Sequence, residues 1–343
     1  MLDFKTYIKK GLTIMIEHRS YFNKAKAGEH HDIQQAAFFR EKRIVSAGWS
    51  MGGETNYNSF GEFKKDFQRK NENWNKQSVH YLFDNLNKDD YIWILDEGIY
   101  YVARVPDDPK NLFQYTNSAE FLKYDAAAYI KNIDWHEVGT EENVPGSVST
   151  AKGRLRAAFQ RIDNQDGQYE YENDKYTITS LIAKQVISKK TKKFPLRKQD
   201  IFSLIGAIGL EDLVAMWLFE THQYVVIPST NKIGTQKYEY VMIDGTKKTN
   251  KKIYVQTKNG DVDLSTKEFE HLISNKMQNE VWLLTTQGKI NNRPDLKFVK
   301  ISGDNRKITP YKIEELLEFI FDLKNLNILP PMVSTWLDFF DWC

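Results

Sequence analysis

Glutamate, glutamine and lysine side chains fall on two neighbouring apolar segments in the second half of the chain. Glu239 lies inside the segment YEYVMI, and Gln256 and Lys258 lie two residues apart where the next segment, KIYVQTK, ends. Side chains two residues apart on a strand point to the same face, so Gln256 and Lys258 share a face. If the two segments pair as antiparallel strands, Glu239 lies beside that face. Glu211, near the start of an expected helix, is then able to approach from above.

Such a set of side chains suits the hydrolysis of a phosphodiester with the help of a divalent metal. Mg²⁺ takes oxygen ligands, usually one or two carboxylates together with carbonyls and waters. The bound ion neutralises charge on the phosphoryl group and lowers the pKa of the attacking water. A lysine beside the metal, here Lys258, stabilises the negative charge that develops in the transition state.

Apolar periodicity predicts the elements that must position these residues. They are a helix at Leu210–Glu220, strands at Gln223–Pro228, Tyr238–Ile243 and Lys252–Thr257, a helix at Ser265–Asn275, a strand at Glu280–Thr285 and a last helix at Tyr311–Leu323. The order helix–strand–strand–strand–helix–strand is typical of a compact α/β domain. This half of the chain is therefore expected to have one central mixed sheet.

The motifs GLEDLVAMWL, YEYVMID and KIYVQTKNG, in this order, resemble the Mrr-like branch of the PD-(D/E)XK nuclease superfamily. The resemblance covers residues 197–301. It implies a restriction-endonuclease-like fold and an endonuclease that cleaves DNA with Mg²⁺ or Mn²⁺. By matching positions it implies four catalytic residues, of which the first three are also metal ligands: Glu211 on the helix, Glu239 on the strand, Gln256 at the variable position, and Lys258.

Two positions depart from the pattern of the family. The strand acid is Glu239 where aspartate is commoner, and Gln256 stands where many members have glutamate. A glutamine carbonyl coordinates Mg²⁺ more weakly than a carboxylate does. The alternative is therefore a protein with a degenerate nuclease fold that binds nucleic acid and does not cleave it.

The first half of the chain has a different texture, with short β-type segments between turns. Tyr91–Leu95 and Ile99–Val105 flank Asp96-Glu97-Gly98, which is typical of a β-hairpin. Phe60–Phe67 has helical spacing, and Val144–Ser149 is expected to be a further strand. These segments predict an α+β, strand-rich barrel.

Parts of this half resemble the PUA-like group, small barrels that include the EVE, YTH and SRA domains and read modified or flipped bases. The resemblance rests on DYIWIL, GIYYVAR, VPGSV and FQRI. A flipped base needs aromatic faces and polar groups at its edge. We therefore expect base or nucleic-acid contacts from Trp49, Trp93, Tyr101, Arg104 and Arg161. The alternative for each of these aromatic residues is a place in the core of the barrel.

Composition limits the class of protein. The chain has 343 residues, 41% of them hydrophobic and 27% charged, which suits two folded domains. Cys343 is the single cysteine, so disulfides and zinc–cysteine clusters are excluded and a cytoplasmic location is expected. No apolar run approaches the roughly 20 residues of a membrane span, so no membrane contact is expected. The net charge is only +2, although lysines gather at residues 189–198 and 247–252.

Together these observations predict a PUA-like reader at residues 1–188, a basic linker at 189–199 and a nuclease domain with C-terminal helices at 200–343. The expected function is restriction of foreign DNA, including DNA that carries modified bases. The expected partner is double-stranded DNA, and a homodimer remains open.

Overall fold

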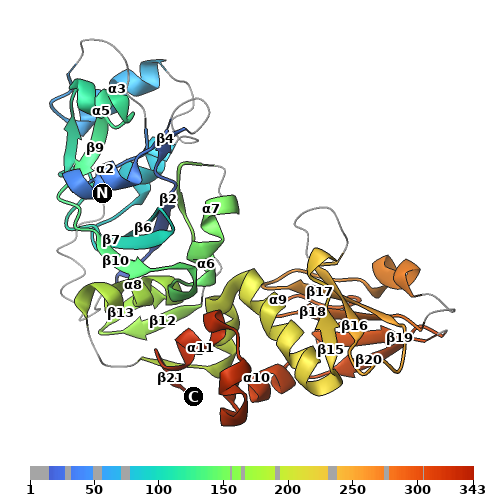
Figure 1. Cartoon of the computed structure of the whole chain (residues 1–343). Coiled ribbons are helices and arrows are strands. Elements are labelled where there is room, and N and C mark those ends of the chain that lie inside the picture. The colour runs from blue at the N-terminus through green and yellow to red at the C-terminus, as the bar shows by residue number, and fades with distance from the viewer. Residues whose placement is uncertain are drawn as a thin grey trace. The chain divides into compact units, whose positions relative to one another are not determined.

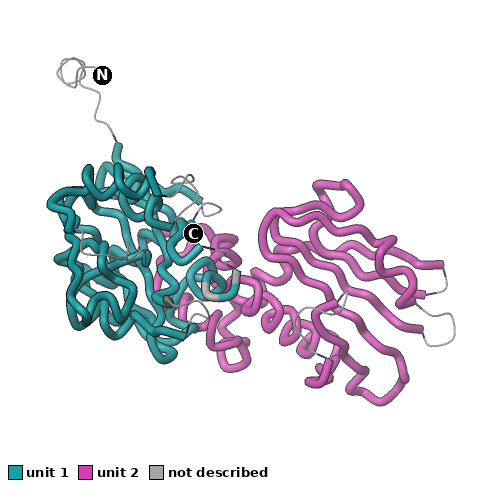
Figure 2. The backbone as a smooth tube through the Cα atoms, turned by 90° about the horizontal axis from the view of Figure 1, so that it is seen from above, with its two compact units in different colours: residues 1–191 teal, residues 192–343 magenta. Residues whose placement is uncertain are grey.

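The computed structural model describes residues 15–27, 32–48, 56–70, 78–154, 157–163, 167–189, 194–230, 238–273, 278–303 and 305–343. The chain forms two compact units, residues 1–191 (unit 1) and residues 192–343 (unit 2), which Figure 2 shows in different colours. Both units mix helices with strands, and several of the sheets contain parallel as well as antiparallel pairs.

Unit 1 is built from short elements (Figure 1). Its strands are β1 (Glu17–His18), β2 (Ser20–Asn23), β3 (Lys26–Ala27), β4 (Ile33–Gln34), β5 (Ile44–Ser46), β6 (Tyr91–Asp96), β7 (Ile99–Arg104), β8 (Phe113–Tyr115), β9 (Ala128–Lys131), β10 (His136–Gly139), β11 (Phe159–Arg161), β12 (Gln168–Tyr171) and β13 (Asp174–Thr177). Its helices are α2 (Ala36–Lys42), α3 (Phe60–Lys70), α4 (Ser78–His80), η2 (Tyr81–Asn85), α5 (Ala119–Lys123), η3 (Glu141–Asn143), α6 (Gly146–Ser149), α7 (Ala151–Arg154) and α8 (Ile178–Ser188).

The largest sheet of unit 1 has the order β10-β7-β6-β2-β11, in which β2 and β6 run parallel. The predicted hairpin is confirmed, since β6 pairs with β7 in antiparallel register around Glu97 and Gly98. Both of these residues have positive φ, the conformation that a two-residue hairpin turn needs. The helix predicted at Phe60–Phe67 is confirmed as α3, and it buries Phe60, Phe63 and Phe67 in an aromatic core.

Two expectations for unit 1 were wrong. Within the part of the chain that the structure describes, the strands do not close into a barrel, because β10 and β11 remain edges of the five-stranded sheet. The segment Val144–Ser149 is not a strand, since α6 begins at Gly146. Pro145 explains the difference, because proline has no N–H for a sheet and its fixed φ suits the entry to a helix.

Unit 2 contains a longer helix and a single large sheet (Figure 1). Its strands are β14 (Pro195–Leu196), β15 (Tyr224–Val226), β16 (Tyr240–Asp244), β17 (Lys252–Lys258), β18 (Glu280–Thr285), β19 (Phe298–Ser302), β20 (Lys307–Tyr311) and β21 (Asp341–Trp342). Its helices are η4 (Lys198–Asp200), α9 (Ile201–His222), η5 (Pro228–Thr230), η6 (Thr266–Leu272), α10 (Glu314–Phe321), η7 (Leu323–Ile328) and α11 (Pro331–Leu337).

The six strands of the central sheet have the order β15-β16-β17-β18-β19-β20. Only β17 and β18 run parallel, and the other neighbours are antiparallel, so the sheet is mixed as expected. The strands β19 and β20 were not predicted. Residues 197–199, which we expected in a linker, lie in unit 2, directly after β14, which pairs with β21 near the end of the chain.

The central sheet is covered on both faces. On one face Trp217 of α9 packs against Trp282 of β18, with ring centroids 5.8 Å apart. On the other face Phe269 of η6 lies in a cluster with Val281 and Leu283. By length and composition the segment Lys198–His222 could cross a membrane, but 61% of its apolar window is buried inside the protein, which is compatible with a soluble protein.

An aromatic cluster surrounds His222, the last residue of α9. Its ring lies 5.1 Å from Trp282 and 5.3 Å from Tyr224 between centroids. Burial lowers the pKa of His222 below its ordinary value, and the positive charges nearby lower it further. The charged groups that act on His222 are Lys300 and Lys251, which lower its pKa, and Glu280 and Glu315, which raise it.

We predict that His222 makes the fold less stable in acid. A histidine with a lowered folded pKa binds more protons in the unfolded chain, so stability rises with pH towards the unfolded pKa of about 6.5 and is lost as pH falls below it. His222→Phe keeps the aromatic packing and should remove that part of the loss. The free energy of unfolding of the full chain is measured with urea between about pH 5 and 8, the range in which an unperturbed histidine titrates. The exposed His271→Phe is the control, and equal acid sensitivity of His222→Phe and wild type would contradict the prediction.

Candidate active site

Glu239, Gln256 and Lys258 lie together where β16 begins and β17 ends. Glu239 lies one residue before β16, and its backbone N–H donates to the carbonyl of Val255 at 2.9 Å, which holds it beside Gln256, the next residue of β17. The Gln256 amide donates to Glu239 Oε1 at 2.5 Å, and Lys258 Nζ donates to the same oxygen at 3.0 Å. The antiparallel pairing therefore produces the contact that the sequence pattern predicted.

Burial differs across this group. The Gln256 residue is 4% exposed, whereas the side chains of Lys258 and Glu239 are 39% and 26% exposed. The buried amide also donates to the carbonyl of Thr257 at 3.1 Å, which fixes its orientation. The charged ends of Glu239 and Lys258 therefore remain within reach of a ligand, while Gln256 supports them from inside the sheet.

Glu211 approaches this group from α9. Its backbone carbonyl accepts a hydrogen bond from the hydroxyl of the buried Tyr240 at 3.0 Å, which ties the helix to β16. Burial raises the pKa of Glu211 to about 7, and the negative charge of Glu239 adds to the shift. Lys258 acts in the opposite direction. Glu211 therefore lies within electrostatic range of the Glu239–Lys258 pair, as expected.

The oxygen donors at this site suit a hard divalent cation. They are the carboxylates of Glu211 and Glu239. If the side-chain amide of Gln256 flips, its carbonyl oxygen is a third donor. Burial is the main cause of the raised pKa of Glu211, and the negative charge of Glu239 adds to it, so a nearby cation would favour the charged form of Glu211. Among the described residues no group of three or more His, Cys, Asp or Glu side chains could hold a metal ion. Any such ion would therefore depend on Gln256 and on water for its other ligands.

Asn259, which the sequence analysis missed, connects the strand to the helix. The helix α9 is interrupted at Gly206, which has φ 64° and ψ −164°. The Asn259 amide donates to the carbonyls of Phe202 and Gly206, both at 2.6 Å, and its oxygen accepts from Thr286 at 3.0 Å. Asn259 therefore fixes the interruption of α9 next to Lys258. A glycine in an apolar helix and an asparagine directly after the lysine were the signals available.

The structure gives little support for phosphate binding by the two lysine clusters, at residues 189–198 and 247–252. In the second cluster, Lys251 forms an ion pair with Glu280 at 2.9 Å and donates to Tyr224. In the first, Arg197 pairs with Asp200, and residues 190–193 lie outside the described residues.

The aromatic residues expected to stack on a base do not form one surface. Trp93 is 0% exposed and lies in the middle of the five-stranded sheet, so the prediction that it contacts a base was wrong. Inward-facing strand positions next to the core favour large aromatic side chains for packing alone. Tyr101 is partly buried and packs against a hydrophobic core cluster of unit 1. The Arg40 guanidinium lies 4.1 Å from the centroid of its ring. Trp49 lies outside the described residues.

The two arginines expected to contact nucleic acid are both in ion pairs. Arg161 pairs with Glu17 at 2.9 Å and with the buried Asp163 at 2.7 Å, so its charge is already neutralised inside unit 1. Arg104 pairs with Asp89, but its side chain is 54% exposed. Of the two, Arg104 therefore remains the one that is open to a ligand.

We predict that Asn259→Ala destabilises unit 2 by about 1 kcal/mol or more, because it leaves two partly buried carbonyls of α9 without their donor. Asn259→Asp keeps the shape but cannot donate, and it should lose at least as much. Urea unfolding of the full chain measures the change, and the exposed Asn305→Ala is the control. If Asn259→Ala and Asn305→Ala have the same free energy of unfolding, the hydrogen bonds from Asn259 to α9 contribute nothing to stability.

Comparisons with known proteins return no match. The chain matches no family model, and no curated protein or solved structure matches it. Function is therefore inferred from the residues and the geometry of the two units alone.

Proposed function

We propose that this protein is a cytoplasmic, Mg²⁺-dependent DNA endonuclease of the restriction type, with the PD-(D/E)XK arrangement in unit 2. The observation that carries the proposal is the contact of Glu239 with both Gln256 and Lys258, at 2.5 and 3.0 Å, beside Glu211. A carboxylate and a lysine in contact across two strands, with a second carboxylate nearby, are the groups that phosphodiester hydrolysis needs.

Glu211 and Glu239 would hold the Mg²⁺, with the Gln256 carbonyl as a weaker third ligand. When bound, the ion would supply Lewis-acid chemistry by neutralising phosphate charge and acidifying a water. The ammonium group of Lys258 lies at the more exposed end of the group, where it can bind a non-bridging phosphate oxygen. The buried Gln256 amide keeps the Glu239 carboxylate turned towards Lys258.

In the same proposal, unit 1 recognises the DNA and unit 2 cleaves it. A reader that detects modified bases would direct cleavage to foreign DNA. The proposed substrate is double-stranded DNA, and a homodimer would allow both strands to be cut. Support for the reader comes from the PUA-like motifs in the sequence and from the exposed Arg104.

A second candidate is a nucleic-acid-binding protein that does not cleave. One observation favours it: the Gln256 NH₂, and not its carbonyl, is turned towards Glu239, where a metal ligand would offer oxygen. In this reading the Glu239–Lys258 pair is only a structural ion pair. Incubation of the purified protein with plain and modified duplex DNA, with and without Mg²⁺, separates the two candidates.

Glu239→Ala and Lys258→Ala should each lower the cleavage rate at least about 100-fold, the effect of removing one group that stabilises charge in a transition state. DNA binding, measured by fluorescence anisotropy, should change by only a few-fold, since these groups act mainly in the transition state. Lys252→Ala, an exposed lysine at the other end of β17, is the matched control. Full cleavage by Glu239→Ala would rule out this site.

Gln256→Glu should keep or raise Mg²⁺-dependent cleavage, because a carboxylate is a stronger ligand than an amide for a hard cation. The Mg²⁺ concentration that gives half-maximal cleavage should fall. Gln256→Ala should raise that concentration in the same titration. If Gln256→Glu folds normally and is inactive, Gln256 acts through its NH₂ group and is not a metal ligand.

A further inference from the structure

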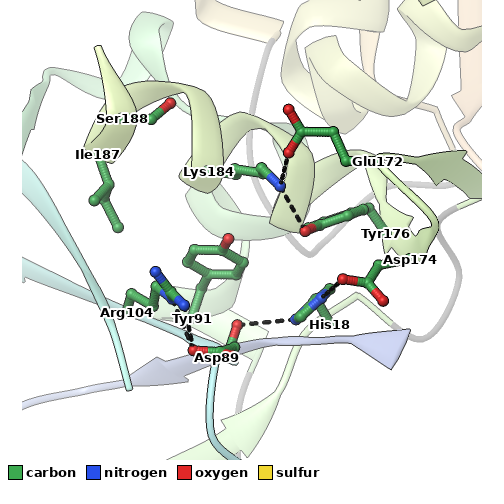
Figure 3. A pocket seen from close by; sticks show the side chains of 10 residues that line it. All are labelled: His18, Asp89, Tyr91, Arg104, Glu172, Asp174, Tyr176, Lys184, Ile187 and Ser188. Carbon is green, nitrogen blue, oxygen red and sulfur yellow. Dashed lines mark hydrogen bonds and ion pairs between the residues drawn. The ribbon is translucent and has the colours of Figure 1, made fainter. Parts of the chain in front are cut away.

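A cavity of about 350 Å³ lies inside unit 1, apart from the group around Glu239. Its walls come from β1, the ends of β6 and β7, the β12–β13 hairpin and the last turns of α8 (Figure 3). Small-molecule sites have volumes of about 300–1,000 Å³, so this cavity suits a small ligand, such as a single ring with its substituents.

The wall of this cavity is polar, and its charged side chains form ion pairs. Arg104, from the end of β7, pairs with Asp89. Lys184 of α8 pairs with Glu172 of the β12–β13 turn at 2.7 Å. Figure 3 shows both pairs on the wall of the cavity.

His18 forms a third pair in the wall. It is 4% exposed, and both of its ring nitrogens face acceptor oxygens. Nδ1 lies 3.2 Å from the backbone carbonyl of Asp89, and Nε2 lies 3.1 Å from the carboxylate of Asp174. Both nitrogens donate only in the imidazolium form, which carries a positive charge. Three cations therefore balance three carboxylates in the wall, so neither an anionic nor a cationic ligand is favoured.

The paired groups can bond to a ligand and still keep their pairs. Guanidinium and ammonium groups have more N–H donors, and carboxylates have more acceptor sites, than one ion pair uses. Lys184, for example, donates to Glu172 and also to the hydroxyl of Tyr176, at 2.7 Å. The wall therefore offers donors and acceptors side by side. Hydroxyl groups match it best, because each of them both donates and accepts.

Tyr91 and Ile187 add apolar surface to this wall. Tyr91 is 3% exposed, and in Figure 3 its hydroxyl points towards α8, across the cavity. Burial raises the pKa of Tyr91 far above its usual range, so its hydroxyl is neutral and can both donate and accept. The cavity therefore combines a polar wall without net charge with a small apolar surface.

We propose that this cavity binds a neutral polyhydroxylated ligand of the size of one sugar ring. A pyranose has hydroxyls around its edge for the ion-paired groups, and C–H groups on its faces for Tyr91 and Ile187. A phosphorylated sugar would add an unbalanced charge, and a zwitterion would have to compete with ion pairs that are already formed. This binding function does not depend on the nuclease activity proposed for unit 2.

The test is calorimetry on the full chain with glucose, galactose, mannose, ribose and myo-inositol as probes. We expect at least one of them to bind with a Kd of about 1–5 mM or tighter, the value for about a dozen non-hydrogen atoms at the ligand efficiency of drug-sized molecules. The phosphate ester of the same ligand should bind more weakly. Lys258→Ala should bind the ligand as wild type does, so a failure of the nuclease proposal leaves this result intact.

Tyr91→Phe should weaken binding about 2- to 10-fold, the value of one neutral hydrogen bond, without lowering the melting temperature. Tyr100→Phe is the matched control, a tyrosine equally buried on β7 that does not line the cavity. Ile187→Trp should fill the cavity and abolish binding. Its control is Gln185→Trp, which introduces the same side chain on α8 at a position that does not line the cavity.

Three results would overturn the proposal. The first is that no probe binds in the millimolar range or tighter. The second is binding that Tyr91→Phe and Ile187→Trp leave unchanged. The third is tighter binding of the phosphate ester than of the neutral ligand.

Discussion

The antiparallel register of β16 and β17 is the constraint on which the geometry of unit 2 depends. It sets Tyr240 opposite Val255, and the backbone N–H of Glu239 donates to the carbonyl of the same Val255, so that the Glu239 side chain meets Gln256. A slip of one residue would turn Gln256 and Lys258 to the opposite face of the sheet and break every contact at the site. The packing of Tyr240 and Val255 resists such a slip, because the same slip would turn the buried Tyr240 away from α9, where its hydroxyl donates to the carbonyl of Glu211. Apolar packing therefore holds the polar group in place.

Much of this arrangement could be predicted from the sequence, because it depends on periodicity and on neighbouring strands. The spacing of Gln256 and Lys258 and the apolar segment that contains Glu239 were enough to predict the contact. The clamp by Asn259 could not be predicted, because its partner carbonyls on Phe202 and Gly206 lie more than 50 residues away along the chain. A helix break exposes such carbonyls only after the chain has folded.

The nucleic-acid contacts proposed for unit 1 were harder to predict, because aromatic residues serve equally as core and as ligand contacts. Trp93 lies in a strand whose residues are buried on both faces, so no alternation marked it as inward. Arg161 is adjacent in space to Glu17, which is far from it in sequence.

The outer strand β20 has a consequence for the protein at high concentration. It forms one edge of the six-stranded sheet, where unpaired backbone groups could recruit a strand from another molecule. Pro310 lies in this strand opposite Val299, and Lys307 begins it. Proline cannot donate a backbone hydrogen bond, and a lysine resists burial against a neighbouring sheet. This edge is thus protected against strand addition from another folded molecule.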